Sequence, residues 1–151
     1  MARIIRVAAA QSGPIQKGES REAVVLRLLE LMKEARSSGC DLVVFTELAL
    51  TTFFPRYFEE DKTRMDSWFE SEMPNPQIQP LFDYATKHGI GFTLGYAEKT
   101  PEGQHFNTSV LVDQSGSTVG KYRKVHLPGH AEFEPERRWQ HLEKRYFEPG
   151  D

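Results

Sequence analysis

The alternation of apolar runs with a helical repeat near the start of the sequence constrains the fold more than any other feature. Residues 4–10 are apolar and partly β-branched, and a Gln-Ser-Gly-Pro cluster ends them, which predicts a buried strand followed by a loop. A helix is predicted next, because Ser20 is a favourable N-cap, Gly39 supplies a stop, and apolar residues recur between them at helical spacing. These residues are Val24, Val25, Leu28, Leu29 and Met32. Residues 42–45 form a short apolar run typical of a strand covered on both faces, so the three segments predict a right-handed βαβ unit.

The rest of the sequence repeats the helix–strand alternation and then changes to a hairpin. Three prolines break the middle of the chain: Pro74, Pro76 and Pro80. After them, a helical spacing of apolar residues that stops at Gly89 predicts a short helix, which leads into a strand over residues 90–96. Residues 108–112 and 118–122 predict two hairpin strands, so the sheet is expected to be mixed. From Leu127 onward the sequence is loop-like with no closing strand or helix, and we expect the whole chain to belong to one α/β domain because it has no internal repeat or linker.

Composition excludes several classes of protein. No apolar run approaches the roughly 20 residues that cross a bilayer, and a net charge of −3 offers no strongly basic surface for nucleic acid. The single cysteine, Cys40, excludes an internal disulfide and a CxxC metal or redox site. We therefore expect a cytoplasmic protein with neither a membrane nor a nucleic-acid partner.

Two charged residues stand at the ends of predicted strands. Glu47 comes just after the strand over residues 42–45, and open α/β sheets bind ligands at the carboxyl ends of their strands. The alternative at this position is a solvated loop glutamate. Lys124 follows Arg123 at the end of the last strand, and consecutive strand residues point to opposite faces, so at most one of these two lines a given cleft. The alternative for both is protection of an edge strand by basic side chains.

Other reactive side chains give weaker signals. Four residues have donor types that suit zinc: His126, His130, Glu132 and His141. Their irregular spacing matches no ligand motif, which favours loop histidines that hydrogen-bond to their neighbours. Four aromatic residues form either a substrate rim or core packing: Phe53, Phe54, Tyr57 and Phe58. Cys40 precedes the strand that Glu47 follows, so at about 3.3 Å per residue the two are roughly 23 Å apart and cannot share a site.

Three segments together resemble the nitrilase superfamily of carbon–nitrogen hydrolases. They are residues 44–48 (VFTEL), residues 106–109 (FNTS) with the turn that follows their strand, and residues 120–127 (GKYRKVHL). The resemblance implies an αββα sandwich, of which this chain is the N-terminal half. It also implies a Glu–Lys–Cys triad, with Glu47 and Lys124 at the positions of the Glu and the Lys.

A closer resemblance is to the N-carbamoyl-D-amino acid amidohydrolases. It is carried by residues 47–56 (ELALTTFFPR), 126–130 (HLPGH) and 140–151 (QHLEKRYFEPGD). It implies that two histidines and one glutamate match residues important in that family: His126, His141 and Glu143. The family usually has proline where Thr46 stands, a change that alters backbone stiffness without removing the neighbouring carboxylate. The nucleophilic cysteine, and the arginines that hold the substrate carboxylate, are expected after Asp151.

The resemblance also implies a mechanism. Glu47 acts as general base for the cysteine thiol, Lys124 stabilises the oxyanion, and Glu143 keeps the lysine charged and oriented. The products are a D-amino acid, ammonia and carbon dioxide, with no metal or organic cofactor, and the enzyme is expected to be a homo-oligomer. We expect these 151 residues alone, as a fragment without the nucleophile, not to turn over substrate. Two alternatives remain: a superfamily amidase for a β-ureido acid or a simple amide, and a non-catalytic interaction module.

Overall fold

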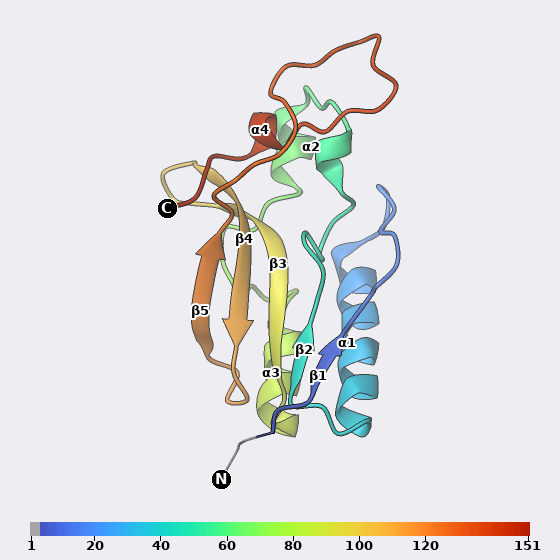
Figure 1. The fold of residues 1–151 in the computed structure, drawn as a ribbon, viewed down its shortest axis with the longest axis vertical. Helices are drawn as coiled ribbons and strands as arrows, with labels where there is room; N and C mark the ends of the chain where they lie inside the picture. The colour runs from blue at the N-terminus through green and yellow to red at the C-terminus, as the bar shows by residue number, and fades with distance from the viewer. Residues whose placement is uncertain (1–3) are drawn as a thin grey trace.

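The computed structural model describes residues 4–151, which form a mixed five-stranded sheet with helices packed on one face (Figure 1). The strands, in their order across the sheet, are β1 (Val7–Ala9), β2 (Leu42–Val44), β3 (Gly91–Lys99), β4 (His105–Val112) and β5 (Thr118–Arg123). The helices are α1 (Arg21–Ser37), α2 (Lys62–Asp66), α3 (Gln79–His88), α4 (Glu143–Tyr146) and the 3-10 turn η1 (Phe54–Arg56). β1, β2 and β3 are parallel, whereas β3, β4 and β5 form an antiparallel meander. The predicted α/β fold with a mixed sheet is confirmed.

Helix α1 begins and ends where the sequence predicts, and α3 ends where predicted but begins at Gln79, so that Pro80 lies in its first turn and not before it. The Ser20 side chain accepts a hydrogen bond from the backbone N–H of Ala23 at 3.2 Å and caps α1. Gly39 follows α1 with φ of +76°, and Gly89 ends α3 with φ of +62°. Both glycines adopt the left-handed conformation that closes a helix at little cost only when no Cβ is present.

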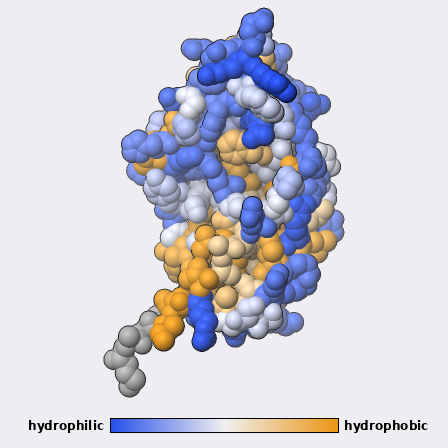
Figure 2. All heavy atoms as spheres, turned by 45° about the vertical axis from the view of Figure 1, so that its right-hand side comes forward, coloured by the Kyte–Doolittle hydropathy of each residue, from blue (hydrophilic) through white to orange (hydrophobic). Residues whose placement is uncertain are grey.

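The first two strands are less covered than predicted. β1 is shorter than the expected strand over residues 4–10 and lies at the edge of the sheet, with Val7 exposed. In β2, Val43 is buried under the helices, whereas Val44 points to the other face and is 39% exposed. The prediction that β2 is covered on both faces is therefore wrong for residues 4–151, because α1 and α3 both lie on one side. Figure 2 shows apolar side chains gathered on the surface near the amino-terminal strand, and the exposed apolar residues include Ile5, Val7, Val44, Leu111 and Val119.

Two separate apolar clusters hold the molecule together. The larger one lies between the sheet and the pair α1 and α3, and Leu28, Met32, Leu81 and Phe92 are fully buried in it. The smaller one lies beyond the carboxyl ends of the parallel strands and is centred on Phe54, which stacks on Trp68 at 4.7 Å between ring centroids. Of the four aromatic residues considered above, Phe54 is thus core, and Phe53 and Phe58 pack against the same cluster.

The carboxyl-terminal quarter contains a helix that the sequence did not predict. The single turn α4 breaks the expected loop after Leu127. It is held by tertiary contacts, because the Leu142 N–H donates to the Pro55 carbonyl at 2.7 Å and the Tyr146 hydroxyl donates to the Tyr57 carbonyl at 2.6 Å. Figure 1 shows α4 beside α2 at the end of the molecule where the loops after the parallel strands gather. Across residues 4–151, no helix combines the length and the apolar character needed to span a membrane.

Candidate active site

Glu47 lies on a short excursion of the backbone between two anchored positions. The Phe45 N–H donates to the Thr93 carbonyl at 3.2 Å, and the Ala49 N–H donates to the Gly95 carbonyl at 2.8 Å. The four residue steps from Phe45 to Ala49 therefore span the same length as the two residue steps from Thr93 to Gly95 in β3. Residues 46–48 bulge out of the sheet as a result. Leu48 completes the excursion with φ of +47°, a left-handed conformation that costs a non-glycine residue roughly 1 to 2 kcal/mol. Burial of the Leu48 side chain in the smaller cluster offsets this strain.

Gly95 makes room for this excursion. A Cβ at Gly95 would lie 2.7 Å from the Thr46 carbonyl oxygen, 2.9 Å from the Glu47 Cα and 3.0 Å from the Leu48 nitrogen. These distances are shorter than van der Waals contact, and all three neighbours are backbone atoms that no side-chain rotation can move. The backbone that carries Glu47 therefore rests directly on β3.

Lys124 approaches Glu47 from the end of β5. Its backbone N–H donates to the Asn107 carbonyl at 2.8 Å and so extends the pairing of β5 with β4 by one residue. Its Nζ donates to Glu47 Oε1 at 2.7 Å and to Glu143 Oε2 at 2.9 Å. Burial alone would lower the pKa of Lys124, but the hydrogen bonds and negative charges of Glu47 and Glu143 outweigh it and raise this pKa above its ordinary value. The ammonium is thus held charged between two carboxylates.

Glu143 is the buried member of this group. Its side chain is 1% exposed, and its Oε1 is 2.9 Å from His141 Nε2. The His141 ring also packs edge-on against Phe53, with ring centroids 5.6 Å apart. The structure therefore brings together four of the five site residues that the resemblance implied: Glu47, Lys124, Glu143 and His141.

Asn107 belongs to the same group, although the sequence did not assign it a role. Its Nδ2 donates to Glu47 Oε1 at 2.5 Å, so the oxygen that Lys124 binds has two donors. Asn107 is 5% exposed and lies in β4 between Phe106 and Thr108. The sequence signal that could have found it was its place in the FNTS segment, one of the three that carry the family resemblance.

The other candidates lie away from this group. His126 is exposed, and no polar contact of its side chain is recorded within residues 4–151. His130 Nε2 instead lies 3.1 Å from Gln140 Oε1, and the zinc hypothesis for the histidines gains no support, because no three His, Cys, Asp or Glu side chains in residues 4–151 cluster as metal ligands. Cys40 is half-buried, packs against the larger cluster, and precedes β2 whereas Glu47 follows it.

Arg123 and Lys124 point to opposite faces, as predicted. Arg123 binds Glu98 through Nε at 3.0 Å and Nη2 at 2.8 Å, on the side of the sheet away from Glu47. Lys121 and the Thr108 hydroxyl donate to the same Glu98 carboxylate. Burial would raise the pKa of Glu98, but its hydrogen bonds from Arg123, Lys121 and Thr108 lower this pKa to about 2.

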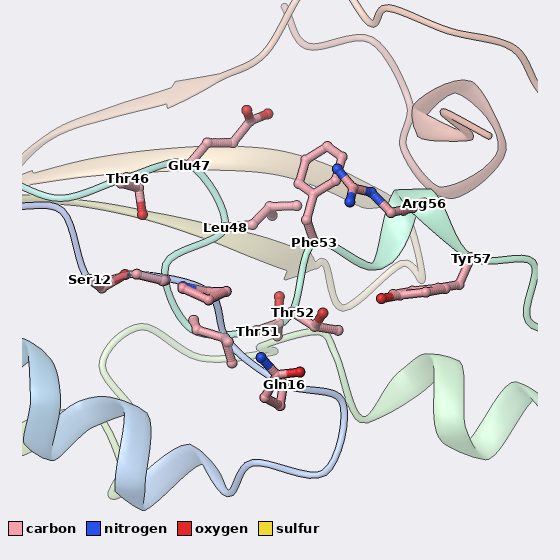
Figure 3. Close-up of a pocket in the computed structure, with 13 residues that line it drawn as sticks. Ser12, Gln16, Thr46, Glu47, Leu48, Thr51, Thr52, Phe53, Arg56 and Tyr57 are labelled. Carbon is pink, nitrogen blue, oxygen red and sulfur yellow. Dashed lines mark hydrogen bonds between the residues drawn. The ribbon is translucent and has the colours of Figure 1, made fainter. Parts of the chain in front are cut away.

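A cavity of about 300 Å³ opens beside the excursion at Glu47 (Figure 3). Its walls come from residues 12–16 of the first loop and from residues 46–57. Thr46 and Glu47 also line a second hollow on the open sheet face, which contains Asn107, Tyr122 and Lys124. The two hollows share Thr46 and Glu47 among their lining residues.

A carboxylate–ammonium pair thus lies at the carboxyl end of β2. The pattern described as carbon-nitrogen hydrolase matches residues 6–151. The chain belongs to this family. An N-carbamoylputrescine amidase of Solanum lycopersicum is 25% identical over 152 residues, covering 99% of this chain and 45% of the relative. A nitrilase of Pyrococcus abyssi is 34% identical over 125 residues, covering 81% of this chain and 40% of the relative.

Solved structures agree on the fold. The carbon-nitrogen hydrolase of Helicobacter pylori G27 superposes with a TM-score of 0.74 at 23% identity, covering 97% of this chain and 45% of that one. Carbon–nitrogen hydrolases in this comparison thus share the mixed sheet and its helical layer with residues 4–151. The chain spans less than half the length of each of these three relatives.

Proposed function

We propose that this carbon–nitrogen hydrolase cleaves N-carbamoyl-D-amino acids to a D-amino acid, ammonia and carbon dioxide. The observation that carries the proposal is the contact between Glu47 and Lys124, with Nζ 2.7 Å from Oε1 and the buried Glu143 behind the ammonium. A carboxylate that serves as a base and a fixed cation that stabilises an oxyanion are the two functions that thiol-dependent amide hydrolysis needs from its surroundings.

The proposed reaction has two halves. Glu47 takes the proton of a cysteine thiol, the thiolate attacks the carbamoyl carbon, and Lys124 stabilises the negative oxygen of the tetrahedral intermediate. The terminal C–N bond breaks, and ammonia leaves with the proton that Glu47 returns. Glu47 then takes a proton from water, which attacks the S-thiocarbamate; the C–S bond breaks, the thiolate regains the proton from Glu47, and the released carbamate decomposes to carbon dioxide and the amino acid.

The nucleophile in this proposal lies outside residues 1–151. Cys40 is the single cysteine in the sequence, and it lies at the end of β2 opposite Glu47. Glu47 is half-exposed on the side of Lys124, with 44% of its side chain accessible, which leaves space for a thiol from elsewhere to approach it. Glu143 and His141 are proposed to position Lys124. His126, in the loop after β5, is proposed as a supporting or substrate-binding residue.

Release of ammonia tests the proposal. The protein expressed from its complete gene is incubated with N-carbamoyl-D-alanine, N-carbamoyl-L-alanine and N-carbamoyl-β-alanine, and ammonia is measured. We expect release from the D-isomer and at least about tenfold less from the other two, a difference of about 1.4 kcal/mol in transition-state binding. Faster release from N-carbamoyl-β-alanine would replace the proposal by a β-ureido acid amidase. No release from any carbamoyl compound would favour a non-catalytic interaction module.

A second substrate is favoured by one finding. Among the relatives named above is an N-carbamoylputrescine amidase, whose named substrate carries an amine where an N-carbamoyl amino acid carries a carboxylate. The same assay with N-carbamoylputrescine separates the two, and ammonia released from it alone would assign the protein to that activity.

A further inference from the structure

The two oxygens of the Glu47 carboxylate have unequal surroundings. Oε1 accepts a hydrogen bond from Asn107 Nδ2 at 2.5 Å and another from Lys124 Nζ at 2.7 Å. Within residues 4–151, no group donates a hydrogen bond to Oε2. Figure 3 shows the carboxylate directed away from Thr51 and Gln16 of the neighbouring cavity. One oxygen of the carboxylate is therefore held by two donors, and the other is held by none.

This asymmetry decides which oxygen can take a proton. An ionised carboxylate has about four lone-pair sites, two on each oxygen, and the two donors occupy both sites of Oε1. A proton added to Oε1 would face the N–H groups of Asn107 and Lys124. A proton added to Oε2 leaves both hydrogen bonds in place, because Oε1 is then the carbonyl oxygen of a carboxylic acid and still accepts. The proton acceptor of Glu47 is therefore Oε2.

Asn107 fixes the carboxylate more firmly than Lys124 can. The terminal torsion of a glutamate is broad, and an ammonium on a flexible four-carbon stem can follow the carboxylate as it turns. The short Asn107 side chain cannot, because its strand is paired on both sides. Asn107 lies opposite Ala97 in β3, and its carbonyl accepts the Lys124 N–H at 2.8 Å. Its amide nitrogen must face Glu47, since a carboxylate offers only acceptors.

We propose that Asn107 is a positioning residue that keeps Oε1 of Glu47 for Lys124 and directs Oε2 to the nucleophilic thiol and then to water. The thiol S–H bond breaks, its proton passes to Oε2, and the same oxygen returns it to the departing ammonia. The proton of the attacking water follows the same route back to the thiolate. The inference rests on the proposed function, because it requires Glu47 to act as a base, but it is the same for every carbamoyl compound considered above.

Asn107→Leu tests the positioning role in the protein expressed from its complete gene. Leucine has a similar size and removes the donor. We expect kcat for N-carbamoyl-D-alanine to fall about 10- to 100-fold, because a small misplacement of a reacting group can cost about 10²-fold. The KM should stay within about threefold, since Asn107 is not proposed to bind the substrate.

Thr108→Val is the matched control for this variant. Thr108 is the next residue of β4, is 1% exposed, and donates to the Glu98 carboxylate at 2.7 Å on the other face of the sheet. The control thus also removes a neutral donor to a carboxylate from a buried position of the same strand. Its kcat should stay within about twofold of the wild type, even if its stability falls. Equal losses of kcat in the two variants would overturn the inference, because they would indicate a general weakening of β4.

Asn107→Asp provides a readout that a merely structural role would not change. Aspartate keeps the shape of asparagine but can donate to Oε1 only while it is protonated, and two adjacent ionised carboxylates repel each other. The ratio of kcat for this variant to kcat for the wild type should therefore rise at least about tenfold from pH 8 to pH 5. The other titratable groups around Glu47, including Lys124, Glu143 and His141, are the same in both proteins. A constant ratio, corrected for the folded fraction measured by circular dichroism, would contradict the donor role.

Alkylation by iodoacetamide separates this inference from the proposed function. Iodoacetamide reacts with the thiolate, and mass spectrometry locates the label, so reaction at Cys40 is not counted. The nucleophile expected after Asp151 should be labelled about tenfold more slowly in Asn107→Leu than in the wild type or Thr108→Val. Slower labelling in a protein that releases no ammonia from any carbamoyl compound would support the positioning role and contradict the hydrolase proposal. Ammonia release with equal labelling and equal kcat in Asn107→Leu and the wild type would overturn the positioning role and leave the hydrolase proposal intact.

Discussion

Two ion-pair networks involve the consecutive residues Arg123 and Lys124 at the end of β5. They differ in their ratio of positive to negative groups. On the helix side, the single carboxylate of Glu98 is bound by Arg123 and Lys121 and also by the Thr108 hydroxyl. On the open side, the single ammonium of Lys124 lies between Glu47 and Glu143. Only 9% of the Glu98 side chain is exposed, against 44% of the Glu47 side chain.

The difference suits the two networks to different roles. The Glu98 carboxylate already accepts hydrogen bonds from Arg123, Lys121 and Thr108, so we expect this network to serve the fold. The Lys124 network has two carboxylates for one ammonium, and the Glu47 carboxylate is accessible, which fits its proposed role as a base. Changes to the first network should therefore alter stability, and changes to the second should alter activity.

The largest expected effect is that of Glu47→Gln. Glutamine keeps the shape and one acceptor for Lys124 but cannot take a proton, so ammonia release should fall about 10²- to 10⁴-fold. Because Glu47 is half-exposed, the free energy of unfolding should change by less than about 1 kcal/mol. Steady-state kinetics and urea unfolding measure the two quantities. A large loss of stability with intact turnover would reverse the assignment of the two networks.

Glu98→Gln should produce the opposite result. It removes the charge that Arg123 and Lys121 share, and breaking a buried ion pair costs about 3 to 5 kcal/mol. We expect the lower end of this range, because the Lys121 side chain is 43% exposed. Glu102→Gln, on the exposed turn between β3 and β4, is the matched control and should change stability by less than about 0.5 kcal/mol. The folded fraction of Glu98→Gln should retain turnover.

The two networks should also fail at opposite ends of the pH scale. The pKa of Glu98 is lowered to about 2, so its contribution to stability is complete above its ordinary pKa of 4.5 and is lost as the pH falls toward 2. The pKa of Lys124 is raised, so its contribution is complete below its ordinary value of 10.5 and is lost as the pH rises through the higher folded value. The stability difference between wild type and Glu98→Gln, measured by urea unfolding, should shrink from pH 5 to pH 2. A constant difference over that range would contradict the assignment.

The smallest effects concern the histidines. His141→Ala removes a hydrogen bond to Glu143 and should lower the free energy of unfolding by about 1 kcal/mol. His126→Ala should change it by less than about 0.5 kcal/mol, because His126 is exposed. Thermal unfolding of the two variants measures the difference in stability. Equal destabilisation would show that His126 has a partner in solution.

The regular elements were predictable because local signals specify them. Ser20 and Gly39 bound α1, Gly89 ends α3, and the apolar runs give the strands, although β1 is shorter than predicted. The short elements were not predictable, since α4 is a single turn held by the hydrogen bond from Leu142 to Pro55. These two residues are 87 positions apart, and a contact over that distance leaves no local pattern in the sequence.

The site was predictable to a similar degree. Motif resemblance identified Glu47 and Lys124, which the fold brings within 2.7 Å across 77 residues of sequence. It did not identify Asn107 as the second donor to Glu47, because the strand pattern alone does not show which strand position faces the carboxylate.

The absence of a side chain at Gly95 limits which substitutions the site tolerates. A Cβ there would meet the Thr46, Glu47 and Leu48 backbone at 2.7 to 3.0 Å. Alanine at this position would push the proposed base away from Lys124, although β3 contributes no side chain to the chemistry. The accuracy of the site thus depends on one missing methyl group, and a sequence comparison that scores only the charged residues would overlook the position that aligns them.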